Sequence, residues 1–189
     1  MCKVLLDRNG QPIKIALIGG ARTGKDTIAG HLCNIFDFKR VAFGDGLRDK
    51  LFETFPDLPH EPKPRQALID FGQACRKIDP LVWIKQLHRT ARVYEKNGYL
   101  NLVITDVRQP NEVEYCRKMG YKLVKVVSSA DLQIARASQS GEKLDVNNEL
   151  DAYALGFKDF NYIIYNNGSL ETLYSQVENL ISVENQLEG

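Results

Sequence analysis

The residues with the clearest chemical potential form a glycine-rich run, Gly19-Gly20-Ala21-Arg22-Thr23-Gly24-Lys25-Asp26-Thr27. Its spacing is glycine, four residues, glycine, lysine, one residue, threonine, which matches a phosphate-binding loop except that Asp26 stands where Ser or Thr usually follows the lysine. Glycines let backbone N–H groups curl around an anion without Cβ clashes. Lys25 can reach the outer phosphates of a nucleotide, and Thr27 can offer a hydroxyl to magnesium. An ordinary glycine-rich turn is the alternative, but it would not require the lysine.

The flanking segments favour the phosphate loop over the turn. Residues 13–18 form a short apolar run typical of a buried parallel strand. Residues 27–36 carry apolar side chains at positions 28, 32, 35 and 36, which is helical spacing. A buried strand before the glycines and a helix after them are the context that supports this motif, because the helix points its positive end at a bound anion.

Strands and helices alternate along the rest of the chain. Further strands are predicted at 41–43, 100–105, 122–127 and 162–165. Helices are predicted from about 47 to 55, from 65 onward, from the Asp79-Pro80 pair to Asn97-Gly98, from Pro110 to Gly120, and after Ser169. This alternation predicts an α/β fold with a central parallel five-stranded sheet covered on both faces, and ligands in such folds bind at the carboxyl ends of the strands.

Charged and polar residues follow several of these strands and could complete a site. Asp106 ends an apolar strand, where it could be a magnesium carboxylate or simply a turn or helix-capping aspartate. Arg48, Arg76 and Arg108 could hold phosphate through guanidinium forks, although a single arginine on a helix is usually solvated. Arg136 lies in a polar segment, 128–148, where a site role and a surface role are equally compatible with the sequence.

Composition limits the other classes of function. The chain has 189 residues, 43% hydrophobic and 26% charged, with a net charge of +1, so one globular domain is expected and no global field attracts nucleic acid or a membrane. Its cysteines are far apart and are expected to be reduced packing residues. His31, His60 and His88 show no metal or triad spacing. No stretch approaches the roughly 20 apolar residues of a membrane helix and no signal peptide is recognised, so a cytoplasmic location is expected.

With these residues in place, the chain resembles the nucleoside monophosphate kinase superfamily, and more closely the deoxynucleoside monophosphate kinases of large bacteriophages. The resemblance spans most of the chain. It is carried by 19–27, by 65–72 with Arg76, Asp79 and Trp83, by 103–112, and by Asn166-Asn167-Gly168-Ser169. The run Gly44-Asp45-Gly46-Leu47-Arg48 is similar to one in adenylate kinases whose arginine holds the acceptor phosphate.

The resemblance implies a three-layer P-loop fold in which 1–189 form one kinase domain, 45–95 a helical acceptor-binding insert, and 128–150 a small lid. It implies transfer of the ATP γ-phosphoryl group to a (deoxy)nucleoside monophosphate with Mg²⁺ as cofactor, small nucleotides as partners, and no nucleic acid or membrane; it also allows a homodimer. The residues implied for ATP are Gly19, Ala21, Arg22, Thr23, Gly24, Lys25, Asp26, Thr27, Asn167 and Gly168. Those implied for the acceptor are Asp45, Arg48, Arg76 and Arg108. Catalytic roles fall to Lys25, Asp106, Arg108 and Arg136, and metal binding to Thr27 and Asp106.

Several alternatives remain open at this level. Another small-molecule kinase of the same architecture, such as a dephospho-coenzyme A or phosphomevalonate kinase, would share the loop. A GTPase would need an Asn-Lys-x-Asp base reader, and a motor ATPase would need Glu after Asp106, where this chain has Val107. A nucleotide-binding protein without catalysis is made plausible by the segment 128–150, because lids of the superfamily commonly carry more than one arginine and this one has only Arg136.

Overall fold

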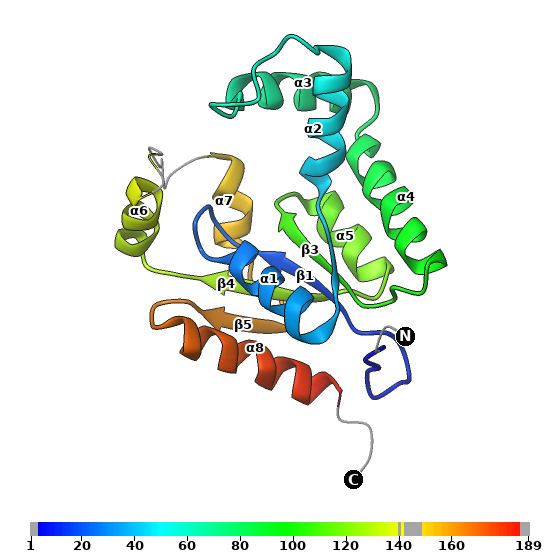
Figure 1. Ribbon diagram of the computed structural model, residues 1–189, viewed down its shortest axis with the longest axis vertical. Helices are drawn as coiled ribbons and strands as arrows, with labels where there is room; N and C mark the ends of the chain where they lie inside the picture. The colour runs from blue at the N-terminus through cyan, green and yellow to red at the C-terminus, as the bar shows by residue number, and fades with distance from the viewer. Residues whose placement is uncertain (1–3, 140, 142–148, 186–189) are drawn as a thin grey trace.

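The fold is a parallel sheet with helices on both faces, seen in a computed structural model that describes residues 4–139, 141 and 149–185 (Figure 1). The five strands lie in the order β2-β3-β1-β4-β5 and every pair is parallel. Their bounds are β1 Lys14–Ile18, β2 Lys39–Val41, β3 Leu102–Val107, β4 Lys122–Val127 and β5 Tyr162–Tyr165. The α/β fold with a five-stranded parallel sheet is therefore confirmed.

The helices form the two outer layers and a lobe above the sheet (Figure 1). They are α1 Lys25–Phe36, α2 Phe43–Thr54, α3 Arg65–Ile78, α4 Val82–Lys96, α5 Pro110–Lys118, α6 Ala130–Gln139, α7 Glu149–Gly156 and α8 Leu170–Glu184. The connection from β1 to β2, through α1, runs towards one edge of the sheet, whereas the connections from β2 to β3, β3 to β4 and β4 to β5 run towards the other edge. Because parallel crossovers are right-handed, α1 packs on one face, and α4 and α5, which follow β2 and β3, pack on the other.

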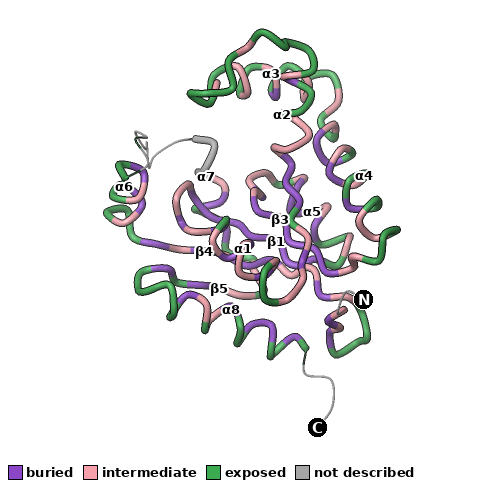
Figure 2. Tube along the Cα trace, in the orientation of Figure 1, coloured by how far each residue is buried: buried purple, intermediate pink, exposed green. Residues whose placement is uncertain are grey.

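Each face of the sheet has its own hydrophobic core, visible as the buried strands in Figure 2. Alternate residues of β1 divide between the two: Ile15 and Leu17 pack with α1 and α8, whereas Ala16 and Ile18 pack with α4 and α5. This division follows from the two-residue period of a strand. The central position of β1 buries both of its faces, so the loop that follows it starts from a rigid point.

The register of β1 and β3 decides what lies beside that loop. Ile18 stands opposite Val107 at the carboxyl ends of the two strands. Residues that follow Ile18 and residues near Val107 therefore leave the sheet side by side. The glycine-rich loop and Asp106 meet at this edge, as expected for a parallel sheet.

Several predicted elements differ in detail from the structure. The strand predicted at 41–43 ends at Val41, and Gly44 to Gly46 form the first turn of α2 rather than a break. The helix predicted from Asp79-Pro80 begins at Val82, and Leu81 is exposed. Helices α6 and α7 were not predicted: α6 lies within the polar segment 128–148, and the apolar residues of α7 show no helical period. Ile35 and Leu170 are exposed although the helical spacing placed them inward.

Other expectations are confirmed. Strand β4 and the start of α5 at Pro110 match the sequence prediction, and the Ser169 hydroxyl caps α8 by accepting from the Thr172 N–H. Cys33, Cys75 and Cys116 are free thiols, whereas Cys2 lies outside the described residues. Among the helices in the described part of the chain, none has the length and apolar character needed to cross a bilayer.

Candidate functional site

The glycine-rich loop joins β1 to α1 and closes around the Lys25 side chain. The Lys25 Nζ donates hydrogen bonds to the carbonyl oxygens of Gly19 at 2.9 Å and Gly20 at 2.6 Å, and the residue is buried. Arg22 and Gly24 have φ values of 59° and 100°, so the loop turns through left-handed backbone conformations. These turns aim the chain back over the first turn of α1, where the free N–H groups of a helix can meet an anion.

Two glycines of the loop are required by close neighbours. A Cβ built on Gly19 would lie 2.4 Å from the carbonyl oxygen of Val126 in β4. A Cβ built on Gly24 would lie 2.2 Å from the Asn166 Nδ2, and the positive φ there also disfavours a side chain. The loop therefore packs against β4 and the end of β5 at distances that only glycine permits.

Asn166, at the end of β5, holds the loop from outside. Its Nδ2 donates to the Thr23 carbonyl oxygen at 2.9 Å, and its backbone N–H donates to the Val127 carbonyl oxygen at 2.7 Å. Sequence reasoning assigned the neighbouring Asn167 and Gly168 to the ATP site and gave Asn166 no role. Asn167 Oδ1 accepts from the Ser129 N–H at 2.8 Å, which links the segments after β4 and β5; its place near the donor base stays a prediction. No local spacing distinguishes the two asparagines, because Thr23, the partner of the Asn166 side chain, is 143 residues away in the chain.

Arg136 on α6 reaches the same loop. Its Nη1 donates to the Arg22 carbonyl oxygen at 3.3 Å, and its Nη2 donates to the Asn166 carbonyl oxygen at 3.1 Å. Gln133 of the same helix lies close to Gly20, since a Cβ there would be 3.4 Å from the Gln133 Oε1. The structure thus places Arg136 beside the glycine-rich loop and not on the outer surface.

Asp106 caps a helix. Its two carboxylate oxygens accept from the N–H groups of Phe43 and Gly44, each at 2.8 Å, and so satisfy the start of α2. Burial raises the pKa of Asp106, while these two N–H groups and the charge of Arg108 oppose the rise. Asp106 therefore caps a helix, which was one of the two roles considered for it. Its other role, as a magnesium ligand, stays a prediction.

Arg40 is a charged residue at this edge that sequence reasoning missed. Its Nη1 donates to Asp45 Oδ2 at 2.8 Å, and Asp45 also lies 3.7 Å from the Arg48 guanidinium. Burial alone would lower the pKa of Arg40, but the bond to Asp45 and the charges of Asp106 and Asp26 raise it. Arg48 and Arg40, both exposed, thus face the Asp45 carboxylate at the start of α2.

Glu112 links the Arg76 side chain to the backbone of Arg108 just after β3. Arg76 Nη2 lies 3.9 Å from Glu112 Oε1, and Glu112 Oε2 accepts from the Arg108 N–H at 2.8 Å. Burial lowers the pKa of Arg76, and the charges of Glu112 and Asp106 oppose that change. Helix α3, which carries Arg76, therefore leans over the carboxyl edge of β3. Two arginines from segments far apart in sequence are gathered beside Asp106.

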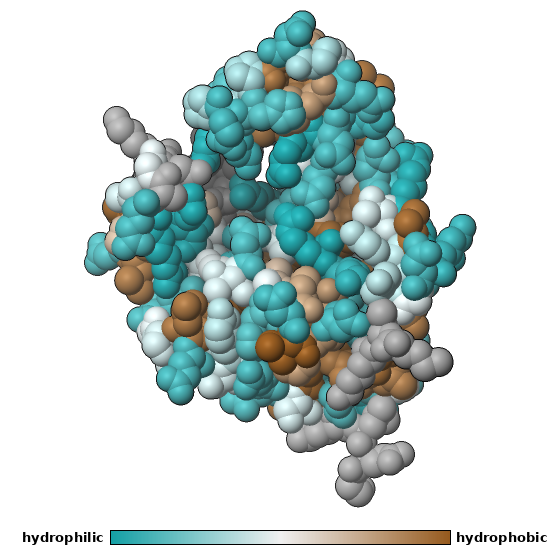
Figure 3. Space-filling view, viewed as in Figure 1, coloured by the Kyte–Doolittle hydropathy of each residue, from teal (hydrophilic) through white to brown (hydrophobic). Residues whose placement is uncertain are grey.

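The space between these elements is open. Figure 3 shows the molecule hollowed beneath the lobe of α2 and α3, with hydrophilic surface around the hollow. Two other cavities lie elsewhere. One of about 770 Å³ is mostly apolar and lies between α2 and α3, lined by Leu51, Phe55 and Phe71 among others. Its α3 residues, at 67, 70, 71 and 74, fall on the helix face opposite Arg76, given 3.6 residues per turn.

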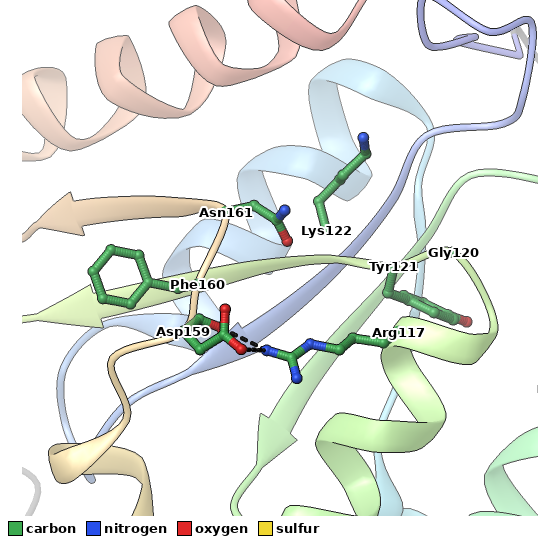
Figure 4. A pocket seen from close by; sticks show the side chains of 7 residues that line it. All are labelled: Arg117, Gly120, Tyr121, Lys122, Asp159, Phe160 and Asn161. Atoms are coloured by element: carbon green, nitrogen blue, oxygen red, sulfur yellow. Dashed lines mark hydrogen bonds and ion pairs between the residues drawn. The ribbon is translucent and has the colours of Figure 1, made fainter.

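The second cavity lies at the amino ends of β4 and β5 (Figure 4). It measures about 340 Å³ and is lined by Arg117, Lys122 and Asp159, with Gly120, Tyr121, Phe160 and Asn161. The Arg117 guanidinium points at Asp159 and pairs with it, and Lys122 lies 3.2 Å from Glu184. The charges at this end of the sheet are thus paired with one another, and the cavity is on the opposite edge from the glycine-rich loop.

A family model described as deoxynucleotide monophosphate kinase matches residues 65–177, which is more than half of the chain. The chain belongs to this family. The match begins at α3 and includes Arg76, Arg108, Glu112 and Asn166. The resemblance inferred from the sequence motifs is confirmed.

Viral relatives carry the same description. The deoxynucleotide monophosphate kinase of Escherichia phage RB69 is 29% identical over 55% of this chain and 38% of its own length, and that of Enterobacteria phage T4 is 28% identical over 56% and 39%. The chain thus matches about two fifths of each phage protein. A putative deoxynucleotide monophosphate kinase of Acanthamoeba polyphaga mimivirus is 22% identical over 93% of this chain and 99% of its own.

Solved structures share the fold. A sugar kinase from Janibacter sp. aligns with a TM-score of 0.56 at 11% identity, covering 92% of this chain and 96% of its own. A gluconokinase from Sinorhizobium meliloti aligns with a TM-score of 0.54 at 13% identity, covering 90% and 92%. Shikimate kinase from Acinetobacter baumannii aligns with a TM-score of 0.51 at 16% identity, covering 93% and 96%. At these identities the likeness concerns the fold, and it confirms the P-loop kinase architecture.

Proposed function

We propose that this protein transfers the γ-phosphoryl group of ATP to a deoxynucleoside monophosphate, giving the diphosphate and ADP. The observation that carries the proposal is the register of β1 and β3, with Ile18 opposite Val107. It sets the Lys25 loop next to the segment that carries Arg108. Family membership supports the class of acceptor. No covalent intermediate is needed, because positioning and charge neutralisation supply most of the catalysis of phosphoryl transfer.

The donor side of the proposed site is the loop between β1 and α1. Backbone N–H groups of Gly19 to Thr27 would bind the ATP phosphates. Lys25 would exchange its bonds to the Gly19 and Gly20 carbonyl oxygens for bonds to the outer phosphates. The other loop residues proposed to bind ATP do so because they form this loop: Ala21, Arg22, Thr23, Gly24 and Asp26. Arg136 is close enough to the loop to stabilise charge on the transferred group.

The acceptor side is proposed for the lobe formed by residues 45–95. Arg76 and Arg108 would hold the acceptor phosphate, since they lie on either side of Glu112 at the end of β3. Arg48 would approach the acceptor phosphate from α2. Its guanidinium is held by Asp45, which also pairs with Arg40. Asn167 and Gly168 remain proposed neighbours of the donor base. Closure of this lobe and of residues 128–150 would keep water from the γ-phosphate; 140 and 142–148 of that segment lie outside the described residues.

A magnesium ion accompanying ATP fits the residues near the loop. Among the described residues no group of three or more His, Cys, Asp or Glu side chains is placed to hold a metal ion. Mg²⁺ bound with a nucleotide takes most of its ligands from phosphates and water and needs only one or two from the protein. Thr27, in the first turn of α1, and Asp106 could supply these. The ion would neutralise charge that develops on the transferred phosphoryl group.

A homodimer and a cytoplasmic location remain predictions of the sequence alone. The kinase proposal competes with other small-molecule kinases of this fold and with nucleotide binding without catalysis. Screening of acceptors distinguishes the proposed activity from that of other small-molecule kinases. A measurement of turnover distinguishes it from nucleotide binding without catalysis.

The test is ADP release with dAMP, dCMP, dGMP or dTMP as acceptor, for the wild type and for Lys25→Ala. Wild type should release ADP with at least one acceptor, and the variant should lose activity by about two orders of magnitude or more, because a buried, preorganised charge on the phosphates is removed. Circular dichroism of the variant should match wild type. If all acceptors give only background ADP release, the kinase proposal is wrong and nucleotide binding alone is favoured.

A further inference from the structure

Glu112 is a buried carboxylate that contacts both segments proposed to hold the acceptor phosphate. It lies in the first turn of α5, and only 4% of the residue is exposed. Its Oε2 accepts from the N–H groups of Arg108 at 2.8 Å and Gln109 at 3.1 Å. Its Oε1 faces Arg76 Nη2 at 3.9 Å. One side chain therefore connects α3 with the segment that joins β3 to α5.

Helix capping does not by itself account for the charge of this residue. Glu112 completes a capping box with Gln109, in which each side chain accepts from the other residue's backbone N–H. Glutamine serves at this position of a capping box as well as glutamate does. A buried carboxylate loses hydration that an amide would lose to a smaller extent, so the acid is retained at an energetic disadvantage unless its charge has a use. The Arg76 guanidinium is the cation that faces it.

We propose that Glu112 is a positioning residue for the acceptor, aligning the Arg76 guanidinium with the Arg108 segment so that both meet one phosphate group. This inference rests on the proposed kinase function. The remaining surroundings of Arg76 fit the role. Its Nη1 lies 3.4 Å from where a Cβ on Gly72 would be, so the guanidinium packs between its own helix and α5.

The neighbouring carboxylate does not replace Glu112. Asp106 attracts Arg76 through its charge and accepts from the Phe43 and Gly44 N–H groups, whereas Glu112 is the carboxylate that lies 3.9 Å from the Arg76 guanidinium. Glu112 has one oxygen engaged by backbone donors and the other turned to Arg76. The contact with Glu112 keeps the N–H donors of the Arg76 guanidinium in one orientation. Less side-chain entropy is therefore lost when a phosphate binds.

The test is steady-state kinetics of Glu112→Gln with the best acceptor among dAMP, dCMP, dGMP and dTMP. The KM for the acceptor should rise about tenfold or more, as expected for loss of an interaction with a charged group. The KM for ATP should stay within about twofold, because the loop at Lys25 is unchanged. Glu114→Gln, an exposed carboxylate on the same helix, is the matched control and should leave both constants unchanged.

The pairing with Arg76 is tested by a double-mutant cycle. In an Arg76→Gln background, Glu112→Gln should change the acceptor KM by less than about twofold, because its partner is already absent. Glu112→Asp keeps the charge but moves it one methylene away, and should give an acceptor KM between those of wild type and Glu112→Gln. If Glu112→Gln does not fold, the double-mutant cycle with Arg76→Gln is measured with Glu112→Asp.

Two results overturn the inference. Unchanged acceptor KM with a lower Tm in Glu112→Gln would show that the residue only caps α5. Equal increases in the KM values for ATP and acceptor would show a general distortion. Either result leaves the kinase function in place as long as wild type turns over. If wild type neither phosphorylates nor binds any of the monophosphates, the function itself is wrong and the role of Glu112 falls with it.

Discussion

The protonation of Glu112 should make the stability of this protein depend on pH in a defined window. Burial raises the pKa of Glu112 from 4.5 to about 7; the Asp106 charge adds to the rise, while the Arg108 N–H and the Arg76 charge oppose it. Between these two values the folded state holds a proton that the unfolded state has released. The free energy of unfolding therefore falls as pH increases from about 4.5 to 7, and the loss is complete above the folded pKa.

The size of the effect follows from the two pKa values. Each pH unit in the window changes the free energy of unfolding by about 1.4 kcal/mol. The full window gives a loss of about 3 kcal/mol, a substantial fraction of the stability of a domain of this size. In Glu112→Gln the side chain carries no titrating proton, so this contribution is absent. The stability of wild type relative to the variant should therefore be highest at the acid end of the window and fall towards neutral pH.

The measurement is urea unfolding of wild type, Glu112→Gln and Glu114→Gln at a series of pH values across the window. The unfolding free energy of wild type minus that of Glu112→Gln should fall by about 3 kcal/mol from the acid to the neutral end. Other titrating groups are common to both proteins and largely cancel in the difference. Glu114→Gln should follow wild type. Parallel pH profiles for wild type and Glu112→Gln would refute the assignment of a raised pKa to this carboxyl.

Two further substitutions test the packing of the glycine-rich loop. Asn166→Asp places an oxygen against the Thr23 carbonyl oxygen, so we expect a loss of about 1–3 kcal/mol in unfolding free energy and a raised KM for ATP, with the acceptor KM unchanged. The same change at Asn34, an exposed residue of α1, is the control, and equal effects at both positions would contradict the assignment. Gly24→Ala adds a Cβ 2.2 Å from Asn166 Nδ2 at a φ of 100°, so Tm should fall and ATP binding should weaken. Gly30→Ala, within α1 and with open space around its Cβ, should leave ATP binding unchanged and raise Tm slightly, and a Gly24→Ala protein that matches it would show that the loop tolerates the side chain.

Local signals in the sequence were sufficient for the fold class and for the donor loop. The spacing of Gly19, Gly24 and Lys25 between an apolar strand and an amphipathic helix depends only on near neighbours. The same holds for Pro110 at the start of α5 and Ser169 at the start of α8, because caps and first-turn prolines act within a few residues. Helix α6 was missed because its residues were read as part of the polar segment 128–148, and so the alignment of Arg136 with the loop was not predicted.

The partners of the site residues were decided by tertiary structure. Sequence reasoning selected Arg76 and Arg108 but not Glu112, which joins them, and selected Asn167 but not Asn166, which holds the loop across a separation of 143 residues. Asp106 was recognised at its strand end, whereas its bonds to the start of α2 depend on where β2 and α2 are set beside β3. Strand order and register bring such residues together, and neither is encoded in the spacing of residues along one segment. Residue types and their local spacing thus supply the chemical groups, and the packing of the sheet sets which of those groups meet.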